Sequence, residues 1–202
     1  MIVLDASGSM LASDFPEGAP NRMLRVQAAL SQVLPEVARM RRIGLIVYGP
    51  GQHDNSCRNV ELKFKPSPDA GRKIIDIAER IRPFGRTALS RSVELAVDVL
   101  RNGPQPAEIV VLTDGDDTCG GDPCQSARRI KAEFANLKIH VIGFRLPSNS
   151  EKSGARCLAE VTGGKFVAAE STDELSEALR QTLTCAEISM LSPARLHAVG
   201  RH

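Results

Sequence analysis

Residues 1–10, MIVLDASGSM, place a short apolar run directly before a cluster of oxygen-bearing side chains. The run at 2–5 has the composition of a buried strand. Asp5, Ser7 and Ser9 follow at the point where that strand would end. Because Asp and Ser are common turn residues, this segment alone predicts only a strand and a turn. A larger role for the three oxygens depends on what the rest of the chain brings beside them.

The remaining sequence alternates short apolar runs with longer amphipathic segments. Apolar residues at helical spacing predict helices, and β-branched runs predict strands. The predicted strands are 2–5, 43–49, 59–64, 107–115, 138–144 and a short one that ends the segment 157–169. The predicted helices are 22–40 with a kink or break at Pro35, 68–81, 88–101, 122–137, the start of 157–169, and 171–183.

Strands that are apolar throughout and alternate with helices predict an α/β fold. We expect a doubly wound, mostly parallel, Rossmann-like sheet with helices on both faces. Residues 59–64 alternate apolar and polar and are the expected antiparallel edge strand, whereas 107–115 is the most hydrophobic run and the expected central strand. Short right-handed connections bring the loops after the strand ends to one edge, where such sheets bind their ligands.

Size and composition narrow the class of protein. A chain of 202 residues is long enough for one domain with a sizeable core. The formal net charge of +2 argues against a dedicated nucleic-acid binder. No apolar run reaches the roughly 20 residues that span a bilayer, and no signal peptide is recognisable. Because the first strand starts at Ile2, we expect a domain taken from a longer precursor or one whose leader has been removed.

Five cysteines suggest disulfide bonds and an oxidising compartment, periplasmic or extracellular. Cys57, Cys119 and Cys124 lie in predicted loops, Cys157 lies at the start of a predicted helix, and Cys185 is the expected unpaired one. Four cysteines allow three pairings, and sequence alone does not choose among them. We favour Cys57 with Cys119 and Cys124 with Cys157.

A zinc site is the alternative use of these side chains. It would consist of His53, Cys57, Cys119 and Cys124. The four residues between the cysteines of CGGDPC are at the upper limit for a structural zinc site, and HDNSC is an irregular partner for it, so disulfides are the preferred interpretation.

Two further oxygen donors follow other predicted elements. Asp114, in LTDGDD, ends the expected central strand, and Thr87, in FGRTALS, precedes a helix. If the first and central strands are neighbours, these residues and the three after the first strand share one edge. Such hard oxygen donors suit Mg²⁺, Mn²⁺ or Ca²⁺ rather than zinc. Since Mg²⁺ keeps several waters, the site would leave a position open for an oxygen from outside the protein.

The segment DASGSM resembles the D-x-S-x-S motif of the von Willebrand factor type A domain, with its metal-ion-dependent adhesion site (MIDAS). The resemblance covers roughly residues 2–183 and implies a domain over 1–185, with 186–202 a tail or linker. The ligand set that it implies is Asp5, Ser7, Ser9, Thr87 and Asp114. By similarity, the hydroxyl groups would contact the metal directly or nearly so, and the two carboxylates would act chiefly through water. A carboxylate from a partner protein would then fill the open position.

The segment TDGDDTCGGDPC is similar to the bacterial secreted or periplasmic branch of that family, often compared with the magnesium-chelatase D subunit. That likeness concerns the A domain alone. The chain has no G-x-x-x-x-G-K-[ST] phosphate loop, so chelatase activity is not implied.

Two other functions would use the same residues. A phosphohydrolase of the haloacid-dehalogenase type would use Asp5 as nucleophile, but its second aspartate would fall at Ser7, which cannot act as a general acid. A purely structural domain would use a metal only to staple the loops. We expect a divalent-cation-dependent protein-binding module, without catalysis.

Overall fold

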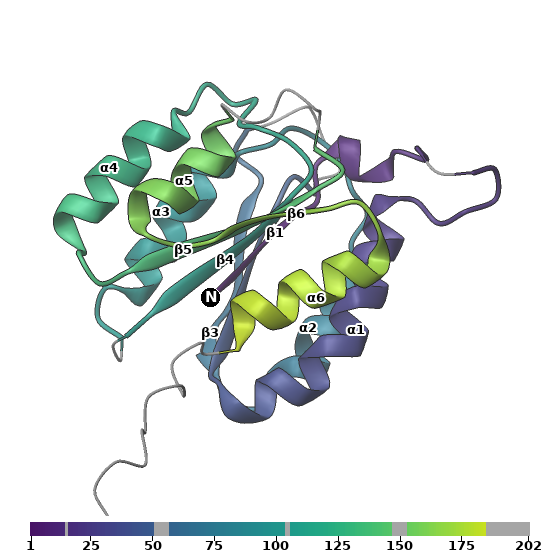
Figure 1. Cartoon of the computed structure of the whole chain (residues 1–202), viewed down its shortest axis with the longest axis horizontal. Helices are drawn as coiled ribbons and strands as arrows, with labels where there is room; N and C mark the ends of the chain where they lie inside the picture. Colours follow the sequence, from purple (N-terminus) through teal and green to yellow (C-terminus); the bar gives the residue numbers. More distant parts are fainter. Residues whose placement is uncertain (15, 51–56, 104–105, 147–152, 185–202) are drawn as a thin grey trace, which may run out of the picture.

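The computed structural model of the chain describes residues 1–14, 16–50, 57–103, 106–146 and 153–184. Its sheet has six strands in the order β3-β2-β1-β4-β5-β6 (Figure 1). The strands are β1 (Ile2–Asp5), β2 (Ile43–Tyr48), β3 (Val60–Ser67), β4 (Glu108–Thr113), β5 (Lys138–Phe144) and β6 (Phe166–Ala169). The helices are η1 (Gly8–Leu11), α1 (Arg22–Met40), α2 (Gly71–Arg80), α3 (Leu89–Leu100), α4 (Pro123–Glu133), α5 (Gly154–Thr162) and α6 (Thr172–Leu183).

Strand β1 lies at the centre of the sheet, parallel to β2 on one side and to β4 on the other. Leu4 faces Val47 in β2 and Leu112 in β4. Strands β5 and β6 continue the parallel arrangement, and β3 pairs antiparallel with β2 at the edge. The predicted doubly wound α/β fold is confirmed, as is the adjacency of the first and central strands.

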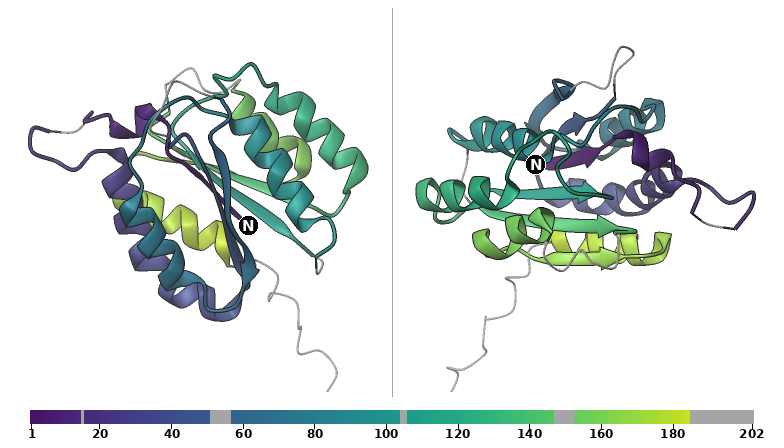
Figure 2. Two further views of the ribbon diagram at one scale, coloured as in Figure 1. Left: turned by 180° about the vertical axis from the view of Figure 1, so that it is seen from behind. Right: turned by 90° about the horizontal axis from the view of Figure 1, so that it is seen from above.

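Helices cover both faces of this sheet, which explains why its central strands are apolar throughout. Helices α1, α2 and α6 pack on one face, and α3, α4 and α5 on the other (Figures 1 and 2). Along β1, Ile2 and Leu4 enter the first core, whereas Val3 enters the second. The sheet is therefore rigidly held, and its strand ends are fixed supports for the loops that follow them.

Several element boundaries differ from the predictions. Helix α2 begins at Gly71 rather than at 68, because β3 continues to Ser67 and Asp69 takes a left-handed conformation with φ of 50°. Helix α1 runs through Pro35 without the break considered from the sequence, since the flanking Leu34 and Val37 are buried in the core.

The remaining differences concern helix ends. Helix α5 starts at Gly154, capped by the Ser153 hydroxyl, so Cys157 lies inside the helix rather than at its start. Helix α4 ends at Glu133, before the predicted 137. The short 3-10 helix η1, directly after the DASGS segment, has no counterpart among the predicted elements.

Two disulfides, Cys57–Cys119 and Cys124–Cys157, tie loops and helix starts together at the carboxyl edge of the sheet. This is the favoured pairing, and it removes these cysteines from the alternative zinc site. Cys185, His53 and the tail 186–202 lie outside the described residues. Within the described ranges, no helix combines the length and apolar character needed to cross a bilayer.

Candidate functional site

The end of β1 carries a buried carboxylate held by two hydrogen bonds. Asp5 has no exposed surface. Its Oδ1 accepts a hydrogen bond from the Ser7 amide at 2.8 Å, and its Oδ2 accepts one from the Thr113 hydroxyl at 2.7 Å. Because Thr113 is the last residue of the neighbouring strand β4, the carboxylate is fixed between the two central strands.

The serine hydroxyls extend this arrangement to the end of β4. Ser7 Oγ and Ser9 Oγ are 3.0 Å apart, and the Ser9 hydroxyl donates to Asp114 Oδ1 at 2.7 Å. Asp114 follows β4 and is buried, whereas Ser9 is exposed. The oxygens of the two strand ends therefore form one continuous hydrogen-bonded chain that reaches the surface at Ser9.

Thr87 is brought to the same edge by the loop before α3. The Gly8 amide donates to the Gly85 carbonyl at 3.0 Å, and the Phe84 amide donates to the Ala6 carbonyl at 2.9 Å. These two bonds join residues 84–87 to the turn after β1, and Thr87 itself is buried. The five predicted ligand residues thus lie on three segments, the end of β1 with the turn and η1 after it, the loop before α3 and the end of β4, which meet at the carboxyl edge of the sheet.

The ionised form of Asp5 is disfavoured by its burial and by the nearby carboxylate of Asp114. Burial, followed by the negative charge of Asp114, raises the pKa of Asp5 from its ordinary value of 3.8 to about 6, although hydrogen bonds from Ser7 and Thr113 act in the opposite direction. A positive charge placed beside Asp5 would favour its ionised form. The electrostatics of the edge therefore favour a cation.

A positive charge beside Asp114 is already supplied by Arg22, the first residue of α1. Its Nη1 donates to Asp114 Oδ2 at 2.9 Å, and its Nε donates to Asp14 Oδ2 at 3.1 Å. The Arg22 side chain is 15% exposed, and the Asp114 side chain that it pairs with is not exposed at all. Arg22 was not among the predicted site residues, because no sequence signal places it beside a residue 92 positions away.

The family model of the von Willebrand factor type A domain matches residues 1–116, more than half of the chain. This chain belongs to that family. The vWA domain is 24% identical over 187 residues to the uncharacterized protein YwmD of Bacillus subtilis (strain 168), covering 88% of this chain and 81% of that one.

Solved structures share its fold. The SpRpn10 VWA domain superposes with a TM-score of 0.66 at 17% identity, over 89% of this chain and 92% of that one. Proximal thread matrix protein 1 from the mussel byssus, with a zinc-occupied MIDAS motif, gives a TM-score of 0.59 at 16% identity, over 90% of this chain and 43% of that one. At these identities the likeness concerns the fold.

Two residues beneath the site of this vWA domain were not singled out as ligand neighbours. Tyr48, inside the predicted strand 43–49, is fully buried, and its hydroxyl donates to Thr113 Oγ1 at 3.1 Å. Burial, followed by the charge of Asp5, raises the pKa of Tyr48 well above 10, so the phenol stays a neutral donor. The only sequence signal for Thr113 is a hydroxyl in the apolar run that precedes Asp114.

A glycine after β2 permits the close approach of the loops. Gly49 has a φ of +100°, and a Cβ there would lie 2.4 Å from the Ser7 amide nitrogen. A side chain at this position would push away the turn that carries the serines. The sequence signal was the glycine-rich segment YGPG, interpreted as a plain connection.

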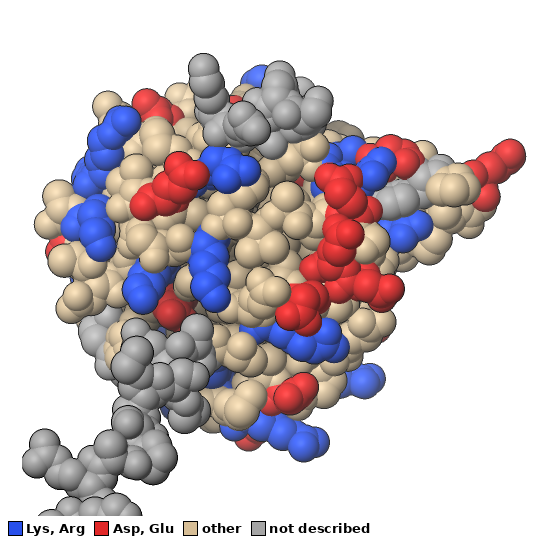
Figure 3. Space-filling view, viewed as in Figure 1, with Lys and Arg blue, Asp and Glu red and all other residues tan. Residues whose placement is uncertain are grey.

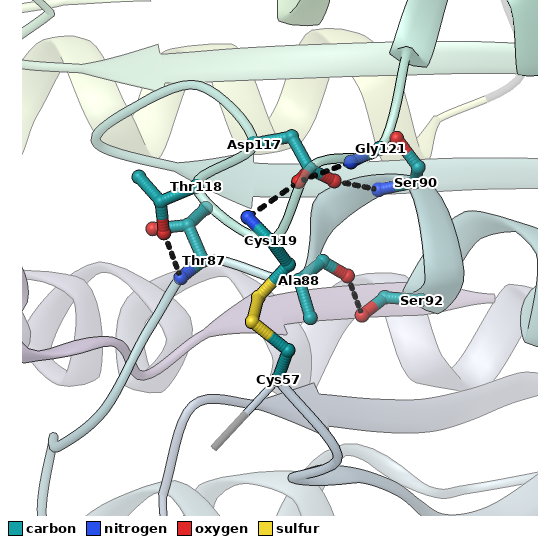
Figure 4. The surroundings of a disulfide bond; sticks show 9 residues. All are labelled: Cys57, Thr87, Ala88, Ser90, Ser92, Asp117, Thr118, Cys119 and Gly121. Carbon is teal, nitrogen blue, oxygen red and sulfur yellow. Dashed lines mark hydrogen bonds between the residues drawn. A yellow bond between two sulfur atoms is a disulfide. The ribbon is translucent and has the colours of Figure 1, made fainter. Parts of the chain in front are cut away.

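The loop after Asp114 is built around a second aspartate. Asp117 accepts hydrogen bonds from the amides of Ser90 at 2.8 Å, Cys119 at 2.8 Å and Gly121 at 3.1 Å (Figure 4). The Cys57–Cys119 disulfide lies against the same loop. Since Ser90 is in the first turn of α3, Asp117 also places a negative charge at the positive end of that helix.

Thr118, between Asp117 and Cys119, forms two hydrogen bonds with the predicted ligand Thr87. The Thr118 hydroxyl accepts from the Thr87 amide and the Thr118 amide donates to the Thr87 carbonyl, both at 2.9 Å (Figure 4). On the other side of the loop, Asp116 accepts from the Ala155 amide in the first turn of α5 at 2.9 Å. Asp116 and Asp117 therefore tie this loop to the first turns of α5 and α3.

Metal sites in proteins are also built from clusters of His, Cys, Asp and Glu side chains. Across the described parts of the chain, no three His, Cys, Asp or Glu side chains are arranged to hold a metal ion. The predicted set has only two carboxylates beside three hydroxyl groups, a composition that suits a hard cation.

Proposed function

We propose that this vWA domain binds a divalent cation at a MIDAS and uses it to capture a carboxylate from a partner protein. The proposed ligands are Asp5, Ser7, Ser9, Thr87 and Asp114, and the proposed cation is Mg²⁺, with Mn²⁺ or Ca²⁺ as substitutes. One observation supports the proposal: the segments that carry these residues lie together at one edge of the sheet, where hydrogen bonds link Ser7, Ser9 and Asp114.

The cation would contribute a Lewis-acidic anchor for an oxygen from outside the protein. The chain's own residues hold the hydroxyl oxygens and the two carboxylates in place, and the exposed Ser9 marks where a partner can reach the site. The fold supplies a precedent, since the byssus protein named above carries zinc at its MIDAS.

The geometry of Asp5 speaks against the phosphohydrolase alternative. A nucleophilic carboxylate needs one oxygen free to reach a phosphorus atom. Both oxygens of Asp5 accept hydrogen bonds, and the side chain is fully buried. We propose a binding role rather than catalysis.

The two disulfides support a periplasmic or extracellular location, because such bonds persist in oxidising compartments. We further propose that the binding module extends over 1–185 and that 186–202 serves as a tail or linker.

Thermal unfolding of the wild type and of Asp5→Ala, in EDTA and then in Mg²⁺, Mn²⁺ or Ca²⁺, tests the site. A ligand that binds only the folded state raises the midpoint, so we expect a cation-dependent rise that Asp5→Ala abolishes. Asp98→Ala, on the exposed surface of α3, is the matched control and should keep the rise. No rise with any cation in the wild type would contradict the proposed site.

A second measurement separates capture of a carboxylate from a purely structural metal. The proton relaxation rate of water bound to protein-held Mn²⁺ falls when another ligand displaces that water. A short peptide containing one glutamate should lower the rate, and the matching glutamine peptide should not. Equal behaviour of the two peptides would favour a metal that only staples the loops.

A further inference from the structure

The proposed site has a permanent positive charge of its own. Arg22 begins α1, directly after Asn21, whose side chain caps that helix by accepting from the Leu24 amide at 3.0 Å. Its backbone position is fixed by the cap and by a hydrogen bond from its amide to the Ala12 carbonyl at 3.3 Å. The guanidinium is therefore delivered to the carboxyl edge by a rigid helix start.

The two oxygens of Asp114 accept hydrogen bonds from different donors, a neutral hydroxyl and a charged guanidinium. Oδ1 accepts from Ser9, on the side where the proposed cation ligands lie, and Oδ2 accepts from Arg22 at 2.9 Å. Because the Asp114 side chain has no exposed surface, water does not screen this ion pair strongly. Arg22 thus neutralises one of the two carboxylates that a divalent cation would need.

Arg22 is itself held by a chain of charges that leads away from the site. Both its Nε and its Nη2 donate to Asp14, and Asp14 also accepts from Arg145 Nε at 3.3 Å. Arg145 Nη1 in turn donates to Glu170 at 2.8 Å. Burial alone would lower the pKa of Arg22, but the hydrogen bonds and charges of Asp14 and Asp114 outweigh it and raise that pKa, so the group stays charged.

The far end of this chain lies at an acidic part of the surface. Exposed acidic side chains gather over the first half of α6, visible as a red stripe in Figure 3. They are Glu170, Asp173, Glu174 and Glu177. Arg145 contacts both Asp14 and Glu170, so it joins the Arg22–Asp14 pair to this negative surface.

We propose that Arg22 is the resident counter-ion of the metal site, which stabilises Asp114 when no divalent cation is bound and weakens the affinity for that cation. This inference rests on the proposed function. A guanidinium and a divalent cation on opposite oxygens of one carboxylate repel each other, so the guanidinium lowers the affinity for the cation. Either positive charge can stabilise the Asp114 carboxylate when the other is absent. Arg22 is a positioning residue, with no direct contact with the metal.

The test is a Mn²⁺ titration by calorimetry, together with thermal unfolding in EDTA, on Arg22→Gln and Arg22→Lys. Arg22→Gln should lower the midpoint in EDTA, because it leaves Asp114 buried without a counter-charge. It should also bind Mn²⁺ about tenfold more tightly than the wild type. Arg22→Lys keeps the charge and should stay within about threefold of the wild-type affinity.

Arg41→Gln is the matched control. Arg41 forms a half-buried ion pair with Glu108 at 2.7 Å, at the opposite end of β4. Its loss should lower the midpoint in EDTA without changing the Mn²⁺ affinity, which separates general destabilisation from loss of the counter-ion.

Each outcome decides something. Equal or weaker Mn²⁺ binding by Arg22→Gln, with normal binding by the wild type, overturns the counter-ion role and leaves the metal site standing. Binding by Arg22→Gln alone supports the counter-ion role in its strongest form. Absence of Mn²⁺ binding in every variant rejects the metal site and, with it, the role of Arg22.

Discussion

The substitution Asp5→Asn should stabilise the metal-free protein, although it removes a residue of the proposed site. Asp5 has its pKa raised from 3.8 to about 6 by burial and by Asp114, so the folded state disfavours its charge. Since a tenfold change in an equilibrium constant corresponds to about 1.4 kcal/mol, this rise is on the order of 3 kcal/mol at pH 7. An uncharged asparagine avoids that penalty.

The hydrogen bonds can adapt to the new amide. An asparagine Oδ1 can still accept from the Ser7 amide, and its Nδ2 can donate to Thr113 Oγ1. The Thr113 hydroxyl can then donate to the Gly115 carbonyl, which already lies at 2.9 Å. The substitution therefore leaves no buried polar group without a partner, and the electrostatic gain should dominate.

Thermal unfolding in EDTA between pH 4 and pH 8 measures this effect. We expect Asp5→Asn to raise the midpoint by about 6–12 °C at pH 7. A carboxyl whose pKa is higher in the folded than in the unfolded state lowers the free energy of unfolding as the pH rises, here between about 4 and 6. Most of the advantage should therefore be gone at pH 4. A midpoint equal to or below the wild type at pH 7, or an advantage that persists unchanged at pH 4, would refute the reasoning.

Two further predictions concern the loop that holds Thr87. Replacing both Cys57 and Cys119 by serine should lower the free energy of unfolding by about 4 kcal/mol in the loop-entropy description and weaken Mn²⁺ binding. The same replacement at the second disulfide should cost nearly as much stability, because the loop entropy varies only with the logarithm of the sequence separation, 62 against 33, while leaving Mn²⁺ binding unchanged. Thr118→Val should remove the acceptor of the Thr87 amide, lower stability by about 1–3 kcal/mol in denaturant unfolding and weaken Mn²⁺ binding. Unchanged calorimetric titrations for both loop variants would show that this loop does not position the ligand.

The fold was predictable from the sequence because its signals are local and periodic. Strands apolar on both faces, such as 2–5 and 107–115, can be stable only between two helical layers. The start of α4 was predictable for the same reason: the helix expected from 122 begins at Pro123, with the Asp122 side chain accepting from the Gln125 amide as its cap. The start of α2 was not predictable, because the left-handed turn at Asp69 follows from the length of β3.

The proposed ligands were predictable only as a set. Asp5, Ser7 and Ser9 alone are compatible with a turn, and it was the order of Thr87 and Asp114 along the chain that suggested a shared edge. The structure brings their loops together as expected, and the metal itself stays a prediction.

Residues that act through tertiary contacts escaped the sequence analysis. The partners of Arg22 are 8 and 92 positions away, and the role of Asp117 depends on the amide of Ser90 in another element. Neither side chain has a local pattern that reveals its partner. Only the assembled fold shows that Asp116 and Asp117 tie helix starts, whereas Asp114, two residues before Asp116, faces the oxygen cluster.

The position of β1 has a mechanical consequence. The strand begins at the sheet edge opposite the oxygen cluster, where Met1 and Leu183, the last residue of α6, line one cavity. A pulling force between a partner held at Ser9 and that opposite edge would run lengthwise along β1. Hydrogen bonds to β2 and β4 flank the strand on both sides, so extraction would have to shear two ladders simultaneously instead of unzipping one bond after another. We expect the domain to resist tension along this axis far better than tension that peels β3 or β6 from the margins of the sheet.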